Sequence, residues 1–237
     1  MLEEDEVPTP IMEERRRNLL ALLLVGIAPS VSVIISFGTD GGIVSQVAYG
    51  LSKIWMLGLP LFWYLKIDGG SFSWSKPERG GYRMAIGLGL GMSALMVGAW
   101  LILGKWLDPD LLKDAVEPVG LLDKRLFFGG VVYWILVNSL LEEYVFRWFL
   151  VVKSESLVGS GNAAIALSAA IFVAHHTFAL AFFGFPWWAN LLASVSLFVG
   201  GSVFSWLYVR YRSVWIPYIA HAICDVAVFS VAAIMLF

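Results

Sequence analysis

The sequence predicts an all-α fold: a polytopic membrane bundle of about seven transmembrane helices, with eight as the alternative count, and one short interfacial helix. Of the 237 residues, 59% are hydrophobic and only 14% are charged, whereas soluble domains average about 25% charged residues. Apolar stretches of about 20 residues, the length that crosses a bilayer as a helix, recur along the chain. No tandem repeat or second domain is evident. We therefore expect one transmembrane domain, 18–237, after a cytoplasmic polar tail, 1–17.

Net charge and cysteine content exclude several classes of protein. The formal net charge of −2 provides no basic surface, so we expect no nucleic-acid partner. The single cysteine, Cys224, excludes an intramolecular disulfide framework and a cysteine-based zinc site. The segment 1–17 is charged and precedes a full-length apolar stretch, unlike a cleavable signal peptide, so we expect the first span to stay in the mature protein.

The expected spans are separated by short polar segments. They cover residues 18–37, 43–65, 82–104, 126–152, 163–183, 191–209 and 214–237. In the third span, Gly87 and Gly91 stand four residues apart, which predicts close helix packing. Residues 105–125 are too charged to span, but their apolar side chains repeat at helical spacing, which predicts an amphipathic helix in the interface. Those side chains are Leu111, Leu112, Ala115, Val116, Val119 and Leu122.

The distribution of lysine and arginine favours a cytoplasmic N-terminus. In that orientation the cytoplasmic segments hold more basic residues than the opposite ones. The cytoplasmic set is Arg15, Arg16, Arg17, Lys66, Lys76, Arg79, Lys153, Arg210 and Arg212, against Lys105, Lys113, Lys124 and Arg125 outside. At 1.5 Å per residue, Glu142, His221, Asp225 and His176 then lie roughly 14, 11, 16 and 20 Å deep. We therefore expect a protein of the cell (inner) membrane whose site opens toward the cytoplasm.

Three charged side chains lie inside the fourth span. Each ionised group costs roughly 2.5–3.5 kcal/mol in hydrocarbon, so each needs a partner. Glu143 and Arg147 are i and i+4 on a helix and are expected to pair, as a structural ion pair at least as readily as a catalytic one. Glu142 faces elsewhere, with Asn138 and Ser139 as its small polar neighbours. Because its own helix offers it no cation, we expect its partners on other helices.

The other spans supply candidate partners for Glu142. His175 and His176 lie in the fifth span, and His221 and Asp225 are i and i+4 in the seventh. A lone membrane histidine can be a packing residue, but two histidine-bearing helices and an unpaired acid at similar depth favour a functional site. A glutamate in a cavity can deprotonate water, and imidazole N–H groups can donate to an oxyanion. These residues predict hydrolysis of a peptide bond without a covalent intermediate, since zinc-helix, serine and paired-aspartate protease motifs are absent.

The charged and imidazole residues form three ordered blocks in the second half of the chain. They read Glu142-Glu143-x-x-x-Arg147, Phe172-x-x-x-His176 and His221-x-x-x-Asp225. These blocks closely resemble the three signature motifs of the CPBP family, the CAAX prenyl endopeptidase and bacteriocin-processing intramembrane proteases, also called the Abi family. The resemblance covers about 126–229, which is the expected catalytic core.

The resemblance implies an intramembrane endopeptidase, CAAX prenyl protease-like and of the glutamate type. By position, Glu142 and His176 would activate the water, while His221 and Asp225 would stabilise the oxyanion. The supporting pair, Glu143 and Arg147, would shape the site. His175 would be a neighbour with a packing or polar role.

One position departs from the eukaryotic-type prenyl proteases, which have Asn where this chain has Asp225. An ionised Asp cannot donate to an oxyanion. Asp225 would then be protonated, would orient His221, or would help to bind a metal, since the family has also been described as metalloproteases. We expect no cofactor, with zinc as the alternative. The ligands would in that case be Glu142, His176, His221 and Asp225.

The expected substrate is a membrane-embedded or lipidated peptide or protein, although no prenyl-binding surface is evident in the sequence. Two other functions stay open at this point. One is a non-catalytic bacteriocin-immunity membrane protein that keeps the same scaffold. The other is a proton-coupled transporter, because buried Glu, His and Asp also build proton relays.

Overall fold

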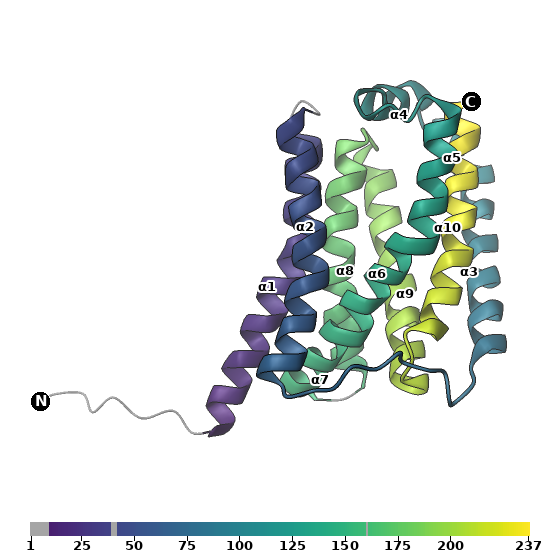
Figure 1. The fold of residues 1–237 in the computed structure, drawn as a ribbon. Coiled ribbons are helices and arrows are strands. Elements are labelled where there is room, and N and C mark those ends of the chain that lie inside the picture. The colour runs from purple at the N-terminus through teal and green to yellow at the C-terminus, as the bar shows by residue number, and fades with distance from the viewer. Residues whose placement is uncertain (1–9, 39–41, 160) are drawn as a thin grey trace, which may run out of the picture.

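The computed structural model describes residues 10–38, 42–159 and 161–237, which form helices packed side by side in one bundle (Figure 1). No strand occurs among these residues, so the all-α prediction is confirmed. The long helices are α1 (Pro10–Gly38), α2 (Ile43–Phe62), α3 (Tyr82–Leu103), α8 (Asn162–Phe182), α9 (Trp187–Tyr211) and α10 (Trp215–Leu236). The short helix α4 (Pro109–Val116) lies across one end of the bundle, where an interfacial helix was expected.

The predicted fourth span is part of one helical stretch from Lys124 to Val158 whose winding alternates between α and π. Its α-helical parts are α5 (Lys124–Tyr133), α6 (Ser139–Glu143) and α7 (Val152–Val158), joined by π-helical turns at Trp134–Asn138 and Tyr144–Val151. π-Helical turns are rare and occur frequently at functional sites. The segment α6, which carries both glutamates of the first motif, therefore lies between two such turns.

Five of the described helices are long and apolar enough to cross a membrane: α1, α3, α8, α9 and α10. The two remaining predicted spans, 43–65 and 126–152, are also helical, but both contain charged side chains and π-helical turns. Large apolar side chains on the outward faces are exposed, among them Leu23, Ile54, Leu95, Leu101 and Val199. In water such a surface would drive association, whereas in hydrocarbon its exposure carries no cost. The chain is an integral membrane protein.

The first helix starts earlier than the sequence pattern suggested. We expected the first span to begin at residue 18, but α1 begins at Pro10. Proline favours the first helical position, and Glu13 and Arg17 are spaced for an i, i+4 pair in the exposed first turns. Residues 1–9 of the predicted tail, and 39–41 of the predicted turn after the first span, lie outside the described residues.

The prediction of close packing at Gly87 and Gly91 is wrong. Both glycines are exposed, and a Cβ added at either would meet nothing within 4 Å. Gly89 is the buried one, because it lies on the other face of α3. A Cβ at Gly89 would come within 3.1 Å of the backbone of Ala220 and of the Ile223 side chain on α10. The absence of a side chain at Gly89 thus lets α3 and α10 approach closely.

The segments that hold the nine basic residues assigned to the cytoplasmic side lie at the same end of the bundle. In Figure 1 the start of α1, the segment between α2 and α3, α7 and the α9–α10 turn are all at the lower end, opposite α4 and the C-terminus. Lys153 Nζ on α7 contacts Asp68 Oδ2 at 2.7 Å and Asn18 Oδ1 at 2.9 Å. Ser213 Oγ donates to the Ser75 carbonyl at 2.6 Å. These hydrogen bonds tie together segments that are far apart in the sequence.

Two of the buried hydrophobic clusters bracket the middle of the bundle. One joins α1, α2, α8 and the Lys124–Val158 stretch and includes Phe146 and Phe172. The other joins α3, α9 and α10 and includes Phe204 and Ala220. His221 lies where these two clusters meet, since the rings of Phe172 and Phe204 both contact it.

Candidate active site

The three motifs occupy three different helices and bring their side chains together. Glu142 lies on α6, His176 on α8, and His221 with Asp225 on α10. Glu142 and His221 are only 8% and 6% exposed, and Asp225 and His176 are partly buried. These four side chains therefore face the interior of the bundle and not the lipid.

The ring of His221 is held by Glu143. His221 Nδ1 lies 2.8 Å from Glu143 Oε1, and because an ionised carboxylate only accepts, Nδ1 donates this hydrogen bond. The other ring nitrogen, Nε2, then faces Glu142 Oε2 at 3.8 Å and Asp225 Oδ1 at 3.7 Å. Both distances exceed a hydrogen bond. The orienting contact that we considered for Asp225 is therefore made by Glu143.

The predicted ion pair between Glu143 and Arg147 is confirmed. Arg147 Nε donates to Glu143 Oε2 at 3.1 Å, and both side chains are 0% exposed. The guanidinium lies over the rings of Phe172 and Phe204 at 4.6 and 5.6 Å from their centroids. A buried cation held by aromatic faces and one carboxylate leaves Glu143 little freedom, and this fixes His221 in turn.

The carboxylate of Glu142 has one occupied oxygen and one free oxygen. Asn138 Nδ2 donates to Oε1 at 2.7 Å, and the Asn138 Oδ1 atom accepts from Lys53 Nζ at 2.6 Å. Glu142 Oε2 is buried and has no hydrogen-bond partner within the described residues. Asn138 was expected beside Glu142, but the part played by Lys53 was missed. The only signal in the sequence was a lysine inside an apolar span.

The two adjacent histidines of α8 have different surroundings. His176 Nδ1 donates to the Phe172 carbonyl at 3.0 Å, so its Nε2 lone pair is available in the neutral ring. His175 is 7% exposed and stacks on Phe146, with centroids 5.3 Å apart and planes at 12°. Its Nδ1 has no hydrogen-bond partner among the described residues. The expected packing role of His175 fits this stacking.

A compact set of possible metal ligands also includes His175. One ligand atom each from Glu142, His175 and His176 lies within 4.8 Å of the others. The set differs from the predicted ligands, since it takes in His175 and leaves out His221 and Asp225. Two imidazoles and a carboxylate are acceptable zinc ligands, and Glu142 Oε2 and His175 Nδ1 are buried without a hydrogen-bond partner among the described residues. The residues present therefore fit a zinc ion.

Asp225 contacts Ser139 on the neighbouring helix. Ser139 Oγ lies within hydrogen-bond distance of Asp225 Oδ2 and 2.7 Å from the Trp134 carbonyl. A serine hydroxyl has one proton and can donate only once. Because the Trp134 carbonyl already accepts the backbone N–H of Ser139, the hydroxyl is available to donate to Asp225 Oδ2. Asp225 on α10 is thereby tied to α6, the helix that carries Glu142.

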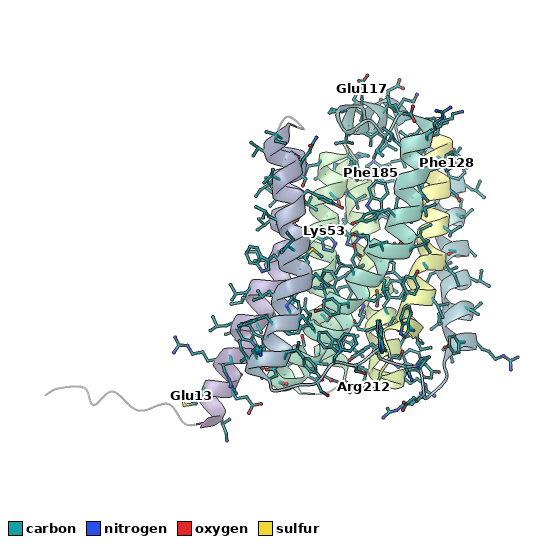
Figure 2. All side chains as sticks on the ribbon, in the orientation of Figure 1. Glu13, Lys53, Glu117, Phe128, Phe185 and Arg212 are labelled. Atoms are coloured by element: carbon teal, nitrogen blue, oxygen red, sulfur yellow. The ribbon has the colours of Figure 1, made fainter. Side chains whose placement is uncertain are left out.

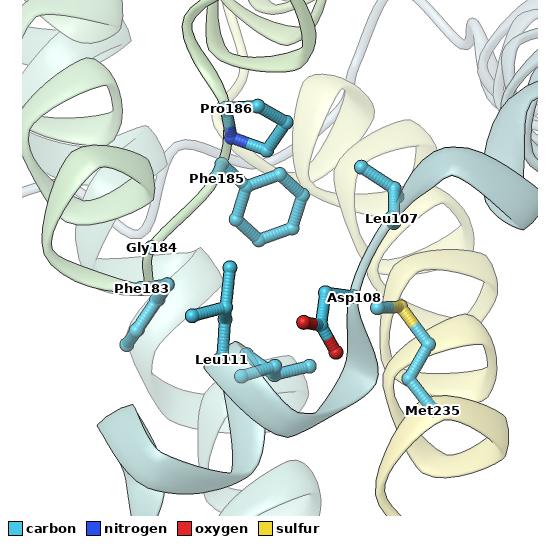
Figure 3. Close-up of a pocket in the computed structure, with 9 residues that line it drawn as sticks. Leu107, Asp108, Leu111, Phe183, Gly184, Phe185, Pro186 and Met235 are labelled. Atoms are coloured by element: carbon cyan, nitrogen blue, oxygen red, sulfur yellow. The ribbon is translucent and has the colours of Figure 1, made fainter.

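Two surface cavities lie away from these residues. Figure 3 shows one between α4 and the α8–α9 turn, lined by residues such as Asp108 and Phe185, with a volume of about 10 Å³. It is too small for a peptide. The second, of about 190 Å³, lies at the opposite end of the bundle and is lined by Trp148, Phe149 and Lys153 among others. Its lining includes none of Glu142, His176, His221 and Asp225.

The fold and these contacts define a class of protein: a polytopic membrane protein with a buried carboxylate–imidazole site between its helices. Residues 124–227 match the family model of the Rce1-like type II CAAX prenyl endopeptidases. The match confirms the resemblance to the CPBP family and covers all three motifs. Comparison with curated proteins and with solved structures finds no match.

Proposed function

We propose that this protein is an intramembrane endopeptidase that hydrolyses a peptide bond of a membrane-associated substrate with a lipidated, CAAX-type C-terminus. The observation that carries the proposal is the buried Glu142 carboxylate. Its Oε2 atom has no hydrogen-bond partner among the described residues and lies 3.8 Å from His221 Nε2, and one of its oxygens lies within 4.8 Å of a ring nitrogen of His176. The family match over the same three motifs supports it.

Glu142 and His176 would hold and activate the attacking water. A carboxylate oxygen and an imidazole nitrogen within 4.8 Å of one another can be bridged by one water at ordinary hydrogen-bond lengths. Glu142 takes a proton as the water oxygen bonds to the scissile carbonyl carbon, and it then gives that proton to the leaving amine as the C–N bond breaks. This sequence needs no covalent enzyme intermediate.

His221 would stabilise the oxyanion that forms on the carbonyl. Because His221 Nδ1 is bonded to Glu143, donation to an oxyanion must come from Nε2, which requires the imidazolium form. The carboxylate of Glu143 balances that charge, while Arg147 holds Glu143 in position. A protonated Asp225 at 3.7 Å from the same nitrogen would be a second donor.

A zinc ion is a second route to the same hydrolysis, and the compact set of Glu142, His175 and His176 favours it over a metal site at the other predicted residues. When bound there, zinc would supply Lewis acidity toward a water ligand. In that case His176 would bind the ion through Nε2, because Nδ1 is occupied by the Phe172 carbonyl. His221 would keep its place opposite the carboxylate.

The proposed orientation places the N-terminus and the basic end of the bundle in the cytoplasm of a cell (inner) membrane. Nine of the counted basic residues belong to segments at this end, against four at the other, as the positive-inside rule requires. Lipidated C-termini lie at the cytoplasmic surface, so the substrate would approach from this side. The bilayer would hold the lipid while the peptide enters the bundle.

The test is cleavage of a synthetic farnesylated CAAX peptide by purified protein. Replacing Glu142 with Gln keeps the shape and removes the base, so we expect the rate to fall about 10²–10⁴-fold. Glu117→Gln, at an exposed position on the opposite end, is the matched control and should keep full activity. Full activity in Glu142→Gln would overturn the proposal. Metal content and the effect of a chelator, measured on the same preparation, separate the glutamate-only route from the zinc route.

A further inference from the structure

We propose that Lys53 on α2 is a positioning residue for Glu142, acting through the side-chain amide of Asn138. This inference rests on the proposed function, because it assigns a task to a residue outside the three motifs. Figure 2 shows Lys53 about midway along α2, away from either end of the bundle. Its helix lies outside the segment that matches the family model, which begins at residue 124.

Lys53 lies inside a predicted membrane span, so its charge needs a structural explanation. A cation inside a membrane span is costly unless it has a partner or reaches the interface. The Lys53 side chain is partly buried, and its ammonium donates to Asn138 Oδ1 at 2.6 Å and lies 5.0 Å from the Tyr49 ring centroid. Neither partner carries a charge. The next group along this chain of hydrogen bonds is an anion, the Glu142 carboxylate, which accepts from Asn138.

The hydrogen-bond roles along this chain of contacts follow from the donors available. An ammonium group has only donors, so the Asn138 atom that it contacts must be the oxygen. The amide nitrogen of Asn138 therefore points the other way and donates to Glu142 Oε1 at 2.7 Å. In this way Lys53 decides the orientation of an amide that could otherwise be turned by 180°.

As a result, the two carboxylate oxygens of Glu142 differ in their hydrogen bonding. Oε1 is tied to Asn138, and Oε2 is left free and directed toward His221 Nε2 at 3.8 Å. With the amide reversed, the Asn138 oxygen would face the carboxylate and repel it, and the carboxylate would turn. Lys53 thus holds the reactive oxygen toward the imidazoles and provides a positive charge on the far side of the amide.

The test combines kinetics with a double-mutant cycle. Lys53→Met keeps the length of the side chain and removes the charge and the donor, while Lys53→Gln keeps a donor without the charge. Because a hydrogen bond to a charged group contributes more than a neutral one, we expect Lys53→Met to lower kcat on the order of 10- to 100-fold. KM should change by less than about twofold, since Lys53 does not contact the substrate. Lys53→Gln should retain part of the lost kcat.

Asn138→Leu is the second arm of the cycle. If Lys53 acts only through Asn138, the double variant Lys53→Met/Asn138→Leu should be about as slow as Asn138→Leu alone. A residue that merely supports the fold would instead give additive effects. Gln46→Met, at an exposed position on the same helix, is the matched control and should leave kcat unchanged.

Two outcomes separate this inference from the proposed function. If Glu142→Gln abolishes cleavage while Lys53→Met keeps kcat within twofold of the unaltered protein, the inference is overturned and the proposed function is not. If the unaltered protein cleaves no peptide, the proposed function fails, and the cycle is read from thermal unfolding of Lys53→Met, Glu142→Gln and their double variant. Coupling between the two sites in the unfolding midpoint would then support the inference, and additive shifts would overturn it.

Discussion

Replacing Arg147 with Met should destabilise the protein severely. The guanidinium and the Glu143 carboxylate are both 0% exposed and lie 3.1 Å apart. Methionine nearly fills the volume but leaves Glu143 with a single partner, His221, at 2.8 Å. Breaking a buried pair by removing one member costs about 3–5 kcal/mol, because the remaining charge stays buried without its counterion.

For a domain of this size, each kcal/mol shifts the unfolding midpoint by about 2–4 °C, so the expected decrease is about 6–20 °C. Thermal unfolding of the detergent-solubilised protein measures it. The control is Arg212→Met, which breaks the pair with Glu155 at 2.7 Å, where the arginine side chain is 39% exposed. Exposed pairs contribute at most about 1 kcal/mol. A decrease for Arg147→Met no larger than that for Arg212→Met would refute this reasoning.

Three further predictions concern individual positions. Asp225→Asn should keep the cleavage rate within about tenfold, because the amide supplies the hydrogen-bond donor that a protonated carboxyl would supply. Asp225→Leu supplies no donor and should lose cleavage. Equal losses for the two variants in the peptide assay would contradict this prediction. His175→Phe preserves the stacking on Phe146, so cleavage should stay intact if the protein uses no metal. If zinc is bound, the variant should lose both the metal and cleavage. Metal analysis of the purified variant distinguishes the two cases. Gly89→Ala should lower the unfolding midpoint, since a Cβ at 3.1 Å from the α10 backbone costs roughly 1–3 kcal/mol. The control is Gly91→Ala, whose Cβ meets nothing within 4 Å. Equal midpoints for the two variants would show that α3 and α10 can move apart.

Local spacing allowed part of the site to be predicted. Glu143 and Arg147 are one helical turn apart, so their pairing depends only on the segment being a helix. The same reasoning placed Asn138 beside Glu142 and Phe172 beside His176. In each case the two residues share one helix, and helix geometry alone decides that they meet.

Helix geometry alone does not predict which side chains on different helices meet. Lys53 and Asn138 are separated by 85 residues, and His221 and Glu143 by 78. Which glutamate binds His221 depends on how α6 and α10 are rotated about their axes, and the π-helical turns beside α6 change that rotation. Gly89 illustrates the same limit, because spacing alone favoured its neighbours Gly87 and Gly91.

The sequence by itself predicted that this chain is a membrane helix bundle and which three motifs hold the candidate site residues. The helix bundle follows from hydrophobicity and from the 3.6-residue period, which each segment expresses independently, whereas the motifs were identified by their resemblance to the CPBP family. Only the tertiary structure decided that Glu143 orients His221, that Lys53 reaches Glu142 through Asn138, and that His175 and His176 both lie within 4.8 Å of a Glu142 carboxylate oxygen. The physical reason is that these contacts depend on the rotation and separation of packed helices, which many side chains fix together.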